Sequence, residues 1–335
     1  SSPCGWSYRV FLAGRRRFRS MILFTADWHI KLGQKNVPLP WACSRFELFF
    51  EEIKLIEKSA DIHVIGGDLF DRVPTMDELT LYFDFVKGVS IPTYIFDGNH
   101  EATKKNKTFF SNLKRATKDV NPLVEVIDTT TEFEWGTLLP YVDLHKKNSI
   151  EKCNKDKPLF THVRGEIPPH VTPEVDLDRF NDFPVVYAGD LHAHSNTQRN
   201  IIYPGSPMTT SFHRDLVKTG YLMISGHDKW TWYEFTLPQL IRKTISSEAQ
   251  MIPTDYHHTI YEIEGDVADL ATVKNSELLD KKVVKRSTES TLDLKDLTIE
   301  EELVEYFTSI LSLPSDKIQN IMGVFNDYSK NATMG

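Results

Sequence analysis

Five short segments of the chain each place acidic, amide or imidazole side chains directly after an apolar stretch. The segments are "ADWH" (26–29), "GGDLFD" (66–71), "DGNHE" (97–101), "FTH" (160–162) and "VVYAGDLHAH" (185–194). Oxygen and imidazole nitrogen ligands mixed in this way suit divalent ions such as Mn²⁺, Zn²⁺ or Fe²⁺, and do not suit a thiolate site. The residues that could bind such ions are Asp27, His29, Asp68, Asp71, Asn99, His100, His162, Asp190, His192 and His194.

Taken singly, each segment carries little information. An aspartate that follows a strand is usually a helix cap or a turn former, and a lone histidine is usually a structural residue. In open α/β sheets, however, binding sites gather outside the carboxyl ends of the strands. Five such segments in succession therefore favour one shared site over five unrelated turns.

The elements that must position these residues alternate between strands and helices. "SRFELFFEEIKLIEKSA" (44–60) predicts a helix with a capping box of Ser44 and Glu47, and Thr75 with Glu78 caps a second helix that ends near Gly88. An alternating pattern around a turn predicts a hairpin over 220–237. Together these elements predict an α/β sandwich. The other expected strands are 21–26, 62–67, 91–96, 123–127, 133–142, 158–162 and 183–188.

The chain ends differ from its centre. Residues 1–20 hold five arginines and no acid, so we expect a tag or translated upstream leader, with a basic DNA-binding arm as the alternative. A composition shift after Pro238 predicts a small second domain of strands around a short helix over 241–297. Residues 298–335 carry two amphipathic helices, which more often pack on their own domain than dock on a partner.

Composition limits the setting in which the chain works. The three scattered cysteines among 335 residues favour a reducing cytoplasm. A net charge of −8 argues against broad, non-specific coating of nucleic acid, although it permits a local basic groove. No apolar run approaches the roughly 20 residues of a membrane-spanning helix.

The order of the motifs resembles a known family. D-x-H, GD-x-x-D, GNH-[DE], a lone His and a G-x-x-H element follow one another as in the calcineurin-like metallophosphoesterases, most closely the SbcD-type nuclease subunits, including those of tailed phages. "GDLFDRVP" (67–74) and "YPGSPMTTSF" (203–212) are similar to segments of this nuclease branch. The resemblance covers 21–240 well and the rest only in layout. It implies a two-sheet sandwich flanked by helices, with a small α/β cap domain and C-terminal helices.

The resemblance also implies a pair of divalent cations, for which Mn²⁺ is the first expectation. Asp27 and His29 would bind the first metal, Asp68 would bridge both, and Asn99 and His162 would bind the second. A bridging carboxylate fits because it can give one oxygen to each cation.

His100 would act by the same resemblance as the acid near the leaving oxygen, oriented by Asp71. The alternative for His100 is a turn residue packed on its neighbours. The alternative for Asp71 is an ion pair with Arg72.

The last ligand element fits two registers, because the family usually reads Gly-His-x-His. Matching the glycine makes Gly189 the anchor and Asp190 and His192 the ligands. Matching the histidines makes His192 and His194 the ligands instead. We favour Asp190 and His192, since a glycine lets the backbone turn close to the metals and oxygen suits Mn²⁺.

Three classes of function compete. The resemblance implies a two-metal DNA exonuclease or endonuclease in recombination and double-strand-break repair. It would act with an SMC-like ATPase of the SbcC type, in the host cytoplasm if phage-encoded, and the resemblance allows a homodimer. The rivals are a phosphoprotein or small-molecule phosphatase and, least expected, a metal-free scaffold. The chain has no phosphate-binding Gly-rich Lys-Ser/Thr motif, so any ATP dependence requires another chain.

The basic run "KKNK" (104–107) directly follows the GNHE segment. Its Lys104, Lys105 and Lys107 could hold DNA phosphates near the metals, and a solvated loop is an equally good interpretation.

Overall fold

The computed structural model of the protein describes residues 20–104, 107–285 and 298–332. The chain divides into two compact units. The first contains the residues up to Ile263 together with Lys274–Lys281, and the second contains Glu264–Val273 and the residues from Lys282 onward. All five polar segments belong to the first unit. The predicted leader, apart from Ser20, lies outside the described residues.

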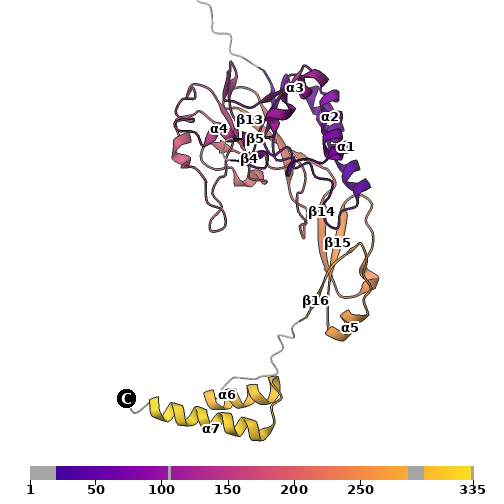
Figure 1. The fold of residues 1–335 in the computed structure, drawn as a ribbon, viewed down its shortest axis with the longest axis vertical. Coiled ribbons are helices and arrows are strands. Elements are labelled where there is room, and N and C mark those ends of the chain that lie inside the picture. The colour runs from indigo at the N-terminus through magenta and orange to yellow at the C-terminus, as the bar shows by residue number, and fades with distance from the viewer. Residues whose placement is uncertain (1–19, 105–106, 286–297, 333–335) are drawn as a thin grey trace, which may run out of the picture. The chain divides into compact units, whose positions relative to one another are not determined.

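The first sheet of the first unit has six strands in the order β13-β12-β1-β2-β3-β6. Figure 1 draws the fold and labels β13 of this sheet. Its four strands β1, β2, β3 and β6 are parallel, whereas β12 and β13 form an antiparallel hairpin paired to β1. The hairpin is the one expected from the alternating pattern. The strands are β1 (Ile22–Thr25), β2 (Ile62–Gly66), β3 (Thr93–Phe96), β6 (Val124–Ile127), β12 (Thr219–Ile224) and β13 (Trp230–Phe235).

The second sheet has five strands in the order β11-β10-β9-β8-β7. Strands β8 to β11 are parallel, and β7 pairs with β8 as an antiparallel hairpin. The single strand expected over 133–142 was therefore wrong, because the chain turns at 134–135 and pairs with itself. The strands are β7 (Thr131–Phe133), β8 (Gly136–Leu139), β9 (Leu159–His162), β10 (Val186–Gly189) and β11 (Ile201–Ile202).

The two sheets pack face to face through an aromatic core. Phe24 of the first sheet meets Phe160 of the second with ring centroids 5.5 Å apart, and Tyr187 lies 5.1 Å from Phe160. All three side chains are fully buried. Because side chains alternate along a strand, neighbouring Leu23 points to the opposite face of the first sheet, into a separate core. The predicted α/β sandwich is confirmed.

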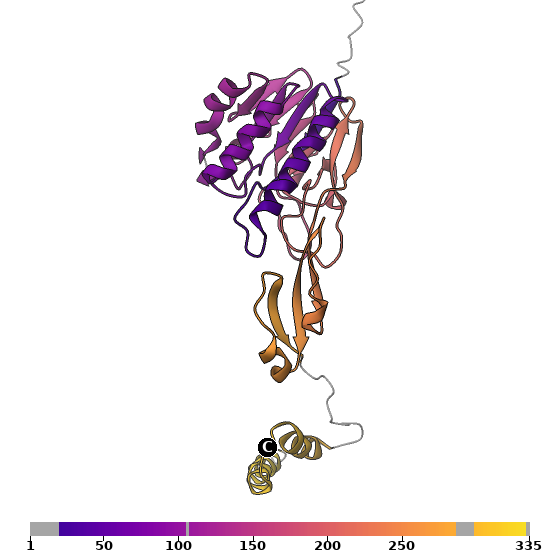
Figure 2. The same ribbon diagram turned by 90° about the vertical axis from the view of Figure 1, so that its right-hand side faces the viewer.

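Three helices cover the outer face of the first sheet (Figure 2). They are α1 (Leu39–Glu57), α2 (Met76–Gly88) and α3 (Phe110–Val120). The Thr75–Glu78 capping box of α2 is formed as predicted. The predicted start of α1 was wrong: the helix begins five residues before Ser44, with Pro38 as its N-cap. Proline is tolerated in a first turn because its missing N–H would have no intrahelical partner there.

Shorter elements complete the first unit. A small hairpin, β4 (Ala102–Lys104) and β5 (Lys107–Thr108), follows β3. A third buried core packs on the outer face of the second sheet, with α4 (Tyr141–Leu144) and the 3₁₀ turn η1 (Leu177–Phe180) contributing to it. Two further 3₁₀ turns are η2 (His194–Asn196) and η3 (Glu248–Gln250).

The chain beyond Pro238 begins with a three-stranded sheet in the order β14-β15-β16. Its elements are β14 (Leu240–Ile245), β15 (His258–Gly265), the helix α5 (Val267–Thr272) and β16 (Leu279–Val284). The strands around a short helix are as expected. Strand β14 and most of β15 belong to the first unit, and α5 belongs to the second. The second unit also holds α6 (Ile299–Glu305), the π-helical turn η4 (Tyr306–Ile310) and α7 (Ser315–Ala332). Among the described residues, no helix is both long and apolar enough to cross a membrane.

We expect Phe160→Ala to destabilise the first unit by about 3–5 kcal/mol, because it removes a buried ring that bridges the two sheets and leaves a cavity. Leu216→Ala is the matched control, since Leu216 is 61% exposed and its loss should change the free energy of unfolding by less than about 0.5 kcal/mol. Urea denaturation measures both. Equal losses in the two variants would contradict this account of the core.

Candidate metal centre

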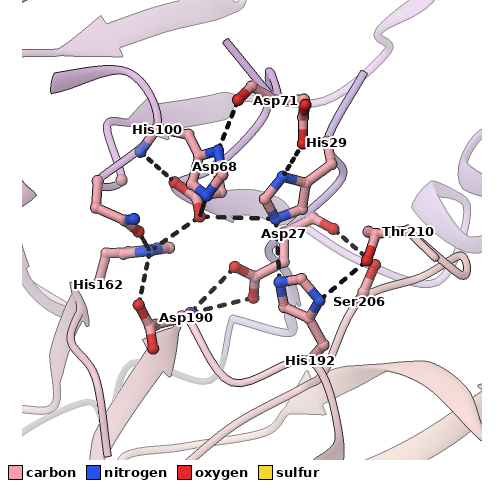
Figure 3. A network of polar contacts seen from close by, with 12 residues as sticks. Asp27, His29, Asp68, Asp71, His100, His162, Asp190, His192, Ser206 and Thr210 are labelled. Carbon is pink, nitrogen blue, oxygen red and sulfur yellow. Dashed lines mark hydrogen bonds and ion pairs between the residues drawn. The ribbon is translucent and has the colours of Figure 1, made fainter. Parts of the chain in front are cut away.

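The five polar segments meet at one place, between the carboxyl ends of strands from both sheets (Figure 3). Asp27 and His29 follow β1, Asp68 follows β2, and Asn99 and His100 follow β3. From the second sheet, His162 ends β9, and Asp190 and His192 follow β10. The predicted gathering at the strand ends is what the structure shows.

The backbone is strained at this place. Asp27, His29, Asp68 and Asp190 have φ angles of 57°, 47°, 49° and 108°. Residues other than glycine rarely adopt positive φ, and such strain persists where the surrounding structure enforces it, often at functional sites. Half of the eight positive-φ residues of this kind in the described chain are predicted ligands. The loops are thus held in conformations that turn the polar side chains inward.

Two glycines let the loops come this close. Gly67 has a φ of 85°, and a Cβ at this position would lie 2.6 Å from Nδ1 of His162. A Cβ at Gly98 would collide with Oδ1 of Asp68. Any larger residue at either position would push the His162 imidazole or the Asp68 carboxylate out of the cluster.

Asp68 lies at the middle of the cluster and is only 2% exposed. Its Oδ2 is 3.4 Å from Nε2 of His162, 3.6 Å from Nε2 of His29 and 3.8 Å from Nε2 of His100. Its Oδ1 accepts a hydrogen bond from the backbone N–H of His100 at 2.9 Å. Burial alone would raise the pKa of Asp68, but His162, His29 and His100 hold it well below its ordinary value. Asp68 is therefore a carboxylate at neutral pH.

His162 is fully buried and fixed by its other ring nitrogen. Its Nδ1 lies 2.9 Å from the carbonyl oxygen of Gly66, which can only accept, so Nδ1 carries a proton. Its Nε2 faces Oδ1 of Asn99 at 3.0 Å, and Oδ1 of Asp190 lies 3.9 Å away. A histidine that donates through one nitrogen and presents the other to carboxylate and amide oxygens is oriented as metal-binding histidines are.

His29 and His192 present their Nε2 atoms to each other at 3.1 Å. Nδ1 of His29 lies 3.2 Å from Oδ1 of Asp71, and Nδ1 of His192 lies 3.3 Å from the hydroxyl of Thr210. His192 is exposed at one side, but the protein that encloses the rest of its ring, and then the neighbouring His29, lowers its pKa to about 4. His192 is thus neutral at neutral pH, with a lone pair free for a cation.

The donor set fits divalent cations. Three overlapping groups each bring their ligand atoms within 4.8 Å of one another: Asp27 with His29 and His192, Asp27 with Asp68 and His162, and Asp68 with His29 and His100. Burial, together with Asp68 and Asp190, raises the pKa of Asp27 well above its ordinary value. Without a cation, the Asp27 carboxyl group therefore tends to keep its proton. A bound cation would balance the buried negative charge in place of that proton.

His100 and Asp71 interact in an unexpected way. Nδ1 of His100 lies 2.6 Å from the backbone carbonyl of Asp71, so the main chain of Asp71, not its carboxylate, contacts the imidazole. The carboxylate contacts His29 and forms an ion pair with Lys31 at 2.8 Å. Arg72 pairs with Glu78, so the alternative of an Asp71–Arg72 pair is not observed.

The segment after β10 places its three candidate ligands differently. His192 belongs to the donor groups described above, whereas Asp190 lies at the rim, with Oδ2 3.5 Å from Nε of Arg164. Nδ1 of His194 lies 2.7 Å from the carbonyl of Tyr203, and its ring stacks on Trp232 with centroids 5.1 Å apart. The donor groups contain His192, which both registers share, and neither Asp190 nor His194, so the choice between the two registers stays a prediction.

Two residues of the site were missed by the sequence reasoning. Glu101 is fully buried and accepts backbone N–H groups of Asp68, Phe70 and Gly98 at 2.7–2.9 Å, which ties the loop after β2 to the loop after β3. The hydroxyl of Ser206 donates to the carbonyl of Asp27 at 2.7 Å. Both residues stand in quoted motifs, Glu101 in "DGNHE" and Ser206 in "YPGSPMTTSF". Their closeness to a glycine in the sequence was the available signal that their side chains bind backbone groups of a tight turn.

The predicted DNA-binding lysines lie on the small hairpin after His100. Lys104 ends β4 and Lys107 begins β5, and both are exposed. Lys105 lies outside the described residues. Their role stays a prediction.

Comparison with known proteins gives concordant matches. A family model described as calcineurin-like phosphoesterase matches residues 20–229. "Probable exonuclease subunit 1" of Escherichia phage T5 is 41% identical over 323 residues, which cover 92% of this chain and 99% of that protein. "Putative phosphoesterase 078R" of Invertebrate iridescent virus 3 is 26% identical over 249 residues, 68% of this chain and 69% of that protein.

Among solved structures, the protein TT1561 of Thermus thermophilus is similar with a TM-score of 0.41 and 12% identity, covering 64% of this chain and 99% of that chain.

The family model spans more than half of the chain and contains all five polar segments. The resemblance seen in the motif order is confirmed, and so is the expected metallophosphoesterase sandwich. The chain belongs to the calcineurin-like phosphoesterases, a family of metal-dependent hydrolases.

Proposed function

We propose that the protein is the nuclease subunit of a DNA exonuclease, hydrolysing phosphodiester bonds with two divalent cations, Mn²⁺ first among them. The observation that carries the proposal is the cluster of carboxylates and imidazoles that forms three overlapping donor groups, buried except at His100 and His192. Support for a nuclease comes from the viral relative named as an exonuclease subunit, which matches over 92% of this chain. The proposal covers exonuclease and endonuclease activity on DNA. It also includes a role in recombination and repair in the host cytoplasm.

In this proposal the metal ligands are Asp27, His29, Asp68, Asn99, His162, Asp190 and His192. Two bound cations would activate a water molecule and neutralise the charge that develops on the phosphate during in-line displacement. Asp68 suits the bridging role because its carboxylate lies between His162 and His29. Asp71 holds the His29 ring through Nδ1, so the opposite nitrogen faces the cluster.

His100 is the proposed acid. Its side chain is 37% exposed, so a substrate can reach it. Because Nδ1 donates to the carbonyl of Asp71, Nε2 is the atom that would pass a proton to the leaving oxygen. The exposed Lys104 and Lys107, with Lys105, are proposed to contact DNA phosphates along the strand that leads to this imidazole.

The rival function is a phosphatase of the same fold, acting on phosphoproteins or small molecules. The same metal centre would serve it, so the choice depends on the substrate and not on the ligands. Incubation with Mn²⁺ and either linear DNA or a phosphomonoester separates the two. The nuclease proposal requires cleavage of DNA, and hydrolysis of the monoester alone would reject it.

We expect Asp68→Asn to lose both cations and all measurable hydrolysis, because it removes the central negative charge of the cluster. His100→Ala should keep both cations and slow hydrolysis by roughly 100-fold or more, since it removes a proton donor and no ligand. Mass spectrometric metal analysis after dialysis against Mn²⁺ checks both variants, with exposed His170→Ala as control. Loss of one cation from His100→Ala would make His100 a ligand.

The register after β10 gives a second prediction. Asp190→Ala should lose one cation, because Oδ1 of Asp190 faces Nε2 of His162 at 3.9 Å. His194→Ala should keep both, because the His194 ring stacks on Trp232 and belongs to none of the donor groups. The same metal analysis decides between them. If His194→Ala loses a cation and Asp190→Ala does not, the histidine-matched register is correct.

A partner ATPase of the SMC-like, SbcC type is proposed because the relative of phage T5 is named as a subunit. We propose residues 241–297 as a capping domain and residues 298–335 as the docking segment. Within α7, Ile321 and Val324 are 40% and 72% exposed, so this helix offers apolar side chains to a partner. We also propose that the chain can form a homodimer.

Ile321→Glu combined with Val324→Glu should abolish co-elution with the partner ATPase in size-exclusion chromatography and leave Mn²⁺-dependent DNA cleavage by the isolated chain unchanged. The physical reason is that two charges would have to be buried in an apolar interface. Lys317→Glu on the same helix is the charge-changing control. Undiminished co-elution of the double variant would reject α7 as the docking element.

A further inference from the structure

Arg45 is a buried cation without an acidic partner. It lies on α1 and is 5% exposed. Both of its hydrogen bonds come from Nη1, to the carbonyl of Thr209 at 2.8 Å and the hydroxyl of Thr209 at 3.3 Å, and its Nε has no partner. In the described part of the chain it forms no ion pair, and burial lowers its pKa to about 10, which leaves it charged at neutral pH. A buried, unpaired charge is costly unless something compensates it.

Arg45 lines a small pocket that adjoins the metal centre. The pocket walls also include His29 and Asp71 of the cluster, together with Lys31, Gln34 and Thr210. Its volume of about 10 Å³ has room for one oxygen atom and not for a whole phosphate group. An anionic oxygen presented from a substrate bound at the metals would reach the guanidinium here.

The charges around the pocket favour an anion. Arg45 and Lys31 are its two fixed cations, and Asp71 is its one carboxylate, already engaged by Lys31 and His29. The guanidinium stacks over the ring of Trp41, with its carbon 4.9 Å from the ring centroid. Stacking and the Thr209 bonds fix the orientation of the guanidinium, so Arg45 lines the pocket without further ordering of its side chain.

We propose that this pocket is a second phosphate subsite, which takes a non-bridging oxygen of the phosphate next to the scissile one in a polynucleotide. The inference rests on the proposed nuclease function and specifies its substrate class. A phosphomonoester or a small diester has no neighbouring phosphate, so of these three substrates the nucleic-acid chain alone would gain this contact. Arginine is well suited to it, because charge-assisted hydrogen bonds to phosphate are strong.

The first experiment compares two substrates in the full chain with Mn²⁺. Arg45→Met should lower kcat/KM on a linear DNA duplex by about 10- to 100-fold, the range of a lost hydrogen bond to a charged group, and change kcat/KM on bis(p-nitrophenyl) phosphate by less than about 2-fold. Arg45→Lys should recover part of the loss. Arg115→Met, at a 95% exposed side chain on α3, is the matched control.

A purely structural role for Arg45 predicts equal losses on both substrates, and that result would overturn the subsite. If the wild-type chain hydrolyses the small diester but not DNA, the nuclease proposal itself fails, and the subsite fails with it. The two failures are therefore distinguishable.

The second experiment has a first arm in the wild-type protein, and that arm does not depend on how a variant folds. DNA duplexes carry a single neutral methylphosphonate at successive positions around a defined cleavage site. We expect a methylphosphonate at one flanking position to slow cleavage by the wild-type protein by about 10-fold or more. The same methylphosphonate should not slow cleavage by Arg45→Met any further. Equal cleavage rates at every flanking position would overturn the proposal.

Discussion

The burial of Asp27 and Asp68 beside one another is the constraint on which the rest of the site depends. Asp27 is fully buried and Asp68 is 2% exposed. Two such carboxylates repel each other and lose their hydration, so the arrangement is favourable only with positive charge between them. His162 supplies part of it: burial alone would lower the pKa of His162, but the carboxylates of Asp68, Asp27 and Asp190 raise it well above its ordinary value.

This constraint explains features that look unrelated along the chain. The positive φ angles at Asp27, Asp68 and Asp190 hold loops that would otherwise turn their carboxylates toward water. Glu101 binds three backbone N–H groups and thereby ties two of those loops together. The predicted ligands come from both sheets, so the packing of Phe24 on Phe160 sets the distance across the cluster as well as stabilising the fold. Fold stability and metal geometry thus depend on the same inter-sheet contacts.

The strand ends, and the gathering of the polar residues that follow them, could be predicted from the sequence, because polar residues after apolar runs are a local signal. Other features are set by contacts between distant residues. Asp71 contacts His100 through a backbone carbonyl, and no residue pattern encodes which atom of a residue is used. Arg45 and Thr209 are separated by 164 positions, so the pocket between α1 and that loop exists only after folding. The start of α1 was misplaced because an internal Ser44–Glu47 pair mimics a cap, while the helix begins at the proline-containing segment before it.

The predicted site residues all lie in one of the two units. The first unit holds every predicted ligand, the predicted acid and the proposed phosphate subsite. Substrate choice would then be made beside the metals, where neighbouring phosphates can be sensed, and not by the metals themselves. A shared metal centre with a distinct neighbouring pocket is how one fold can serve both nucleases and phosphatases.

The central claim is that the buried cluster holds two neighbouring divalent cations that support cleavage of DNA. Electron paramagnetic resonance during Mn²⁺ titration of the full, chelator-dialysed chain tests it directly, with cleavage of linear duplex DNA followed in the same samples. The account predicts two tightly bound, spin-coupled Mn²⁺ ions per chain, and DNA cleavage that appears as both sites fill. Binding of a single ion, or DNA cleavage that persists in excess chelator, would contradict it.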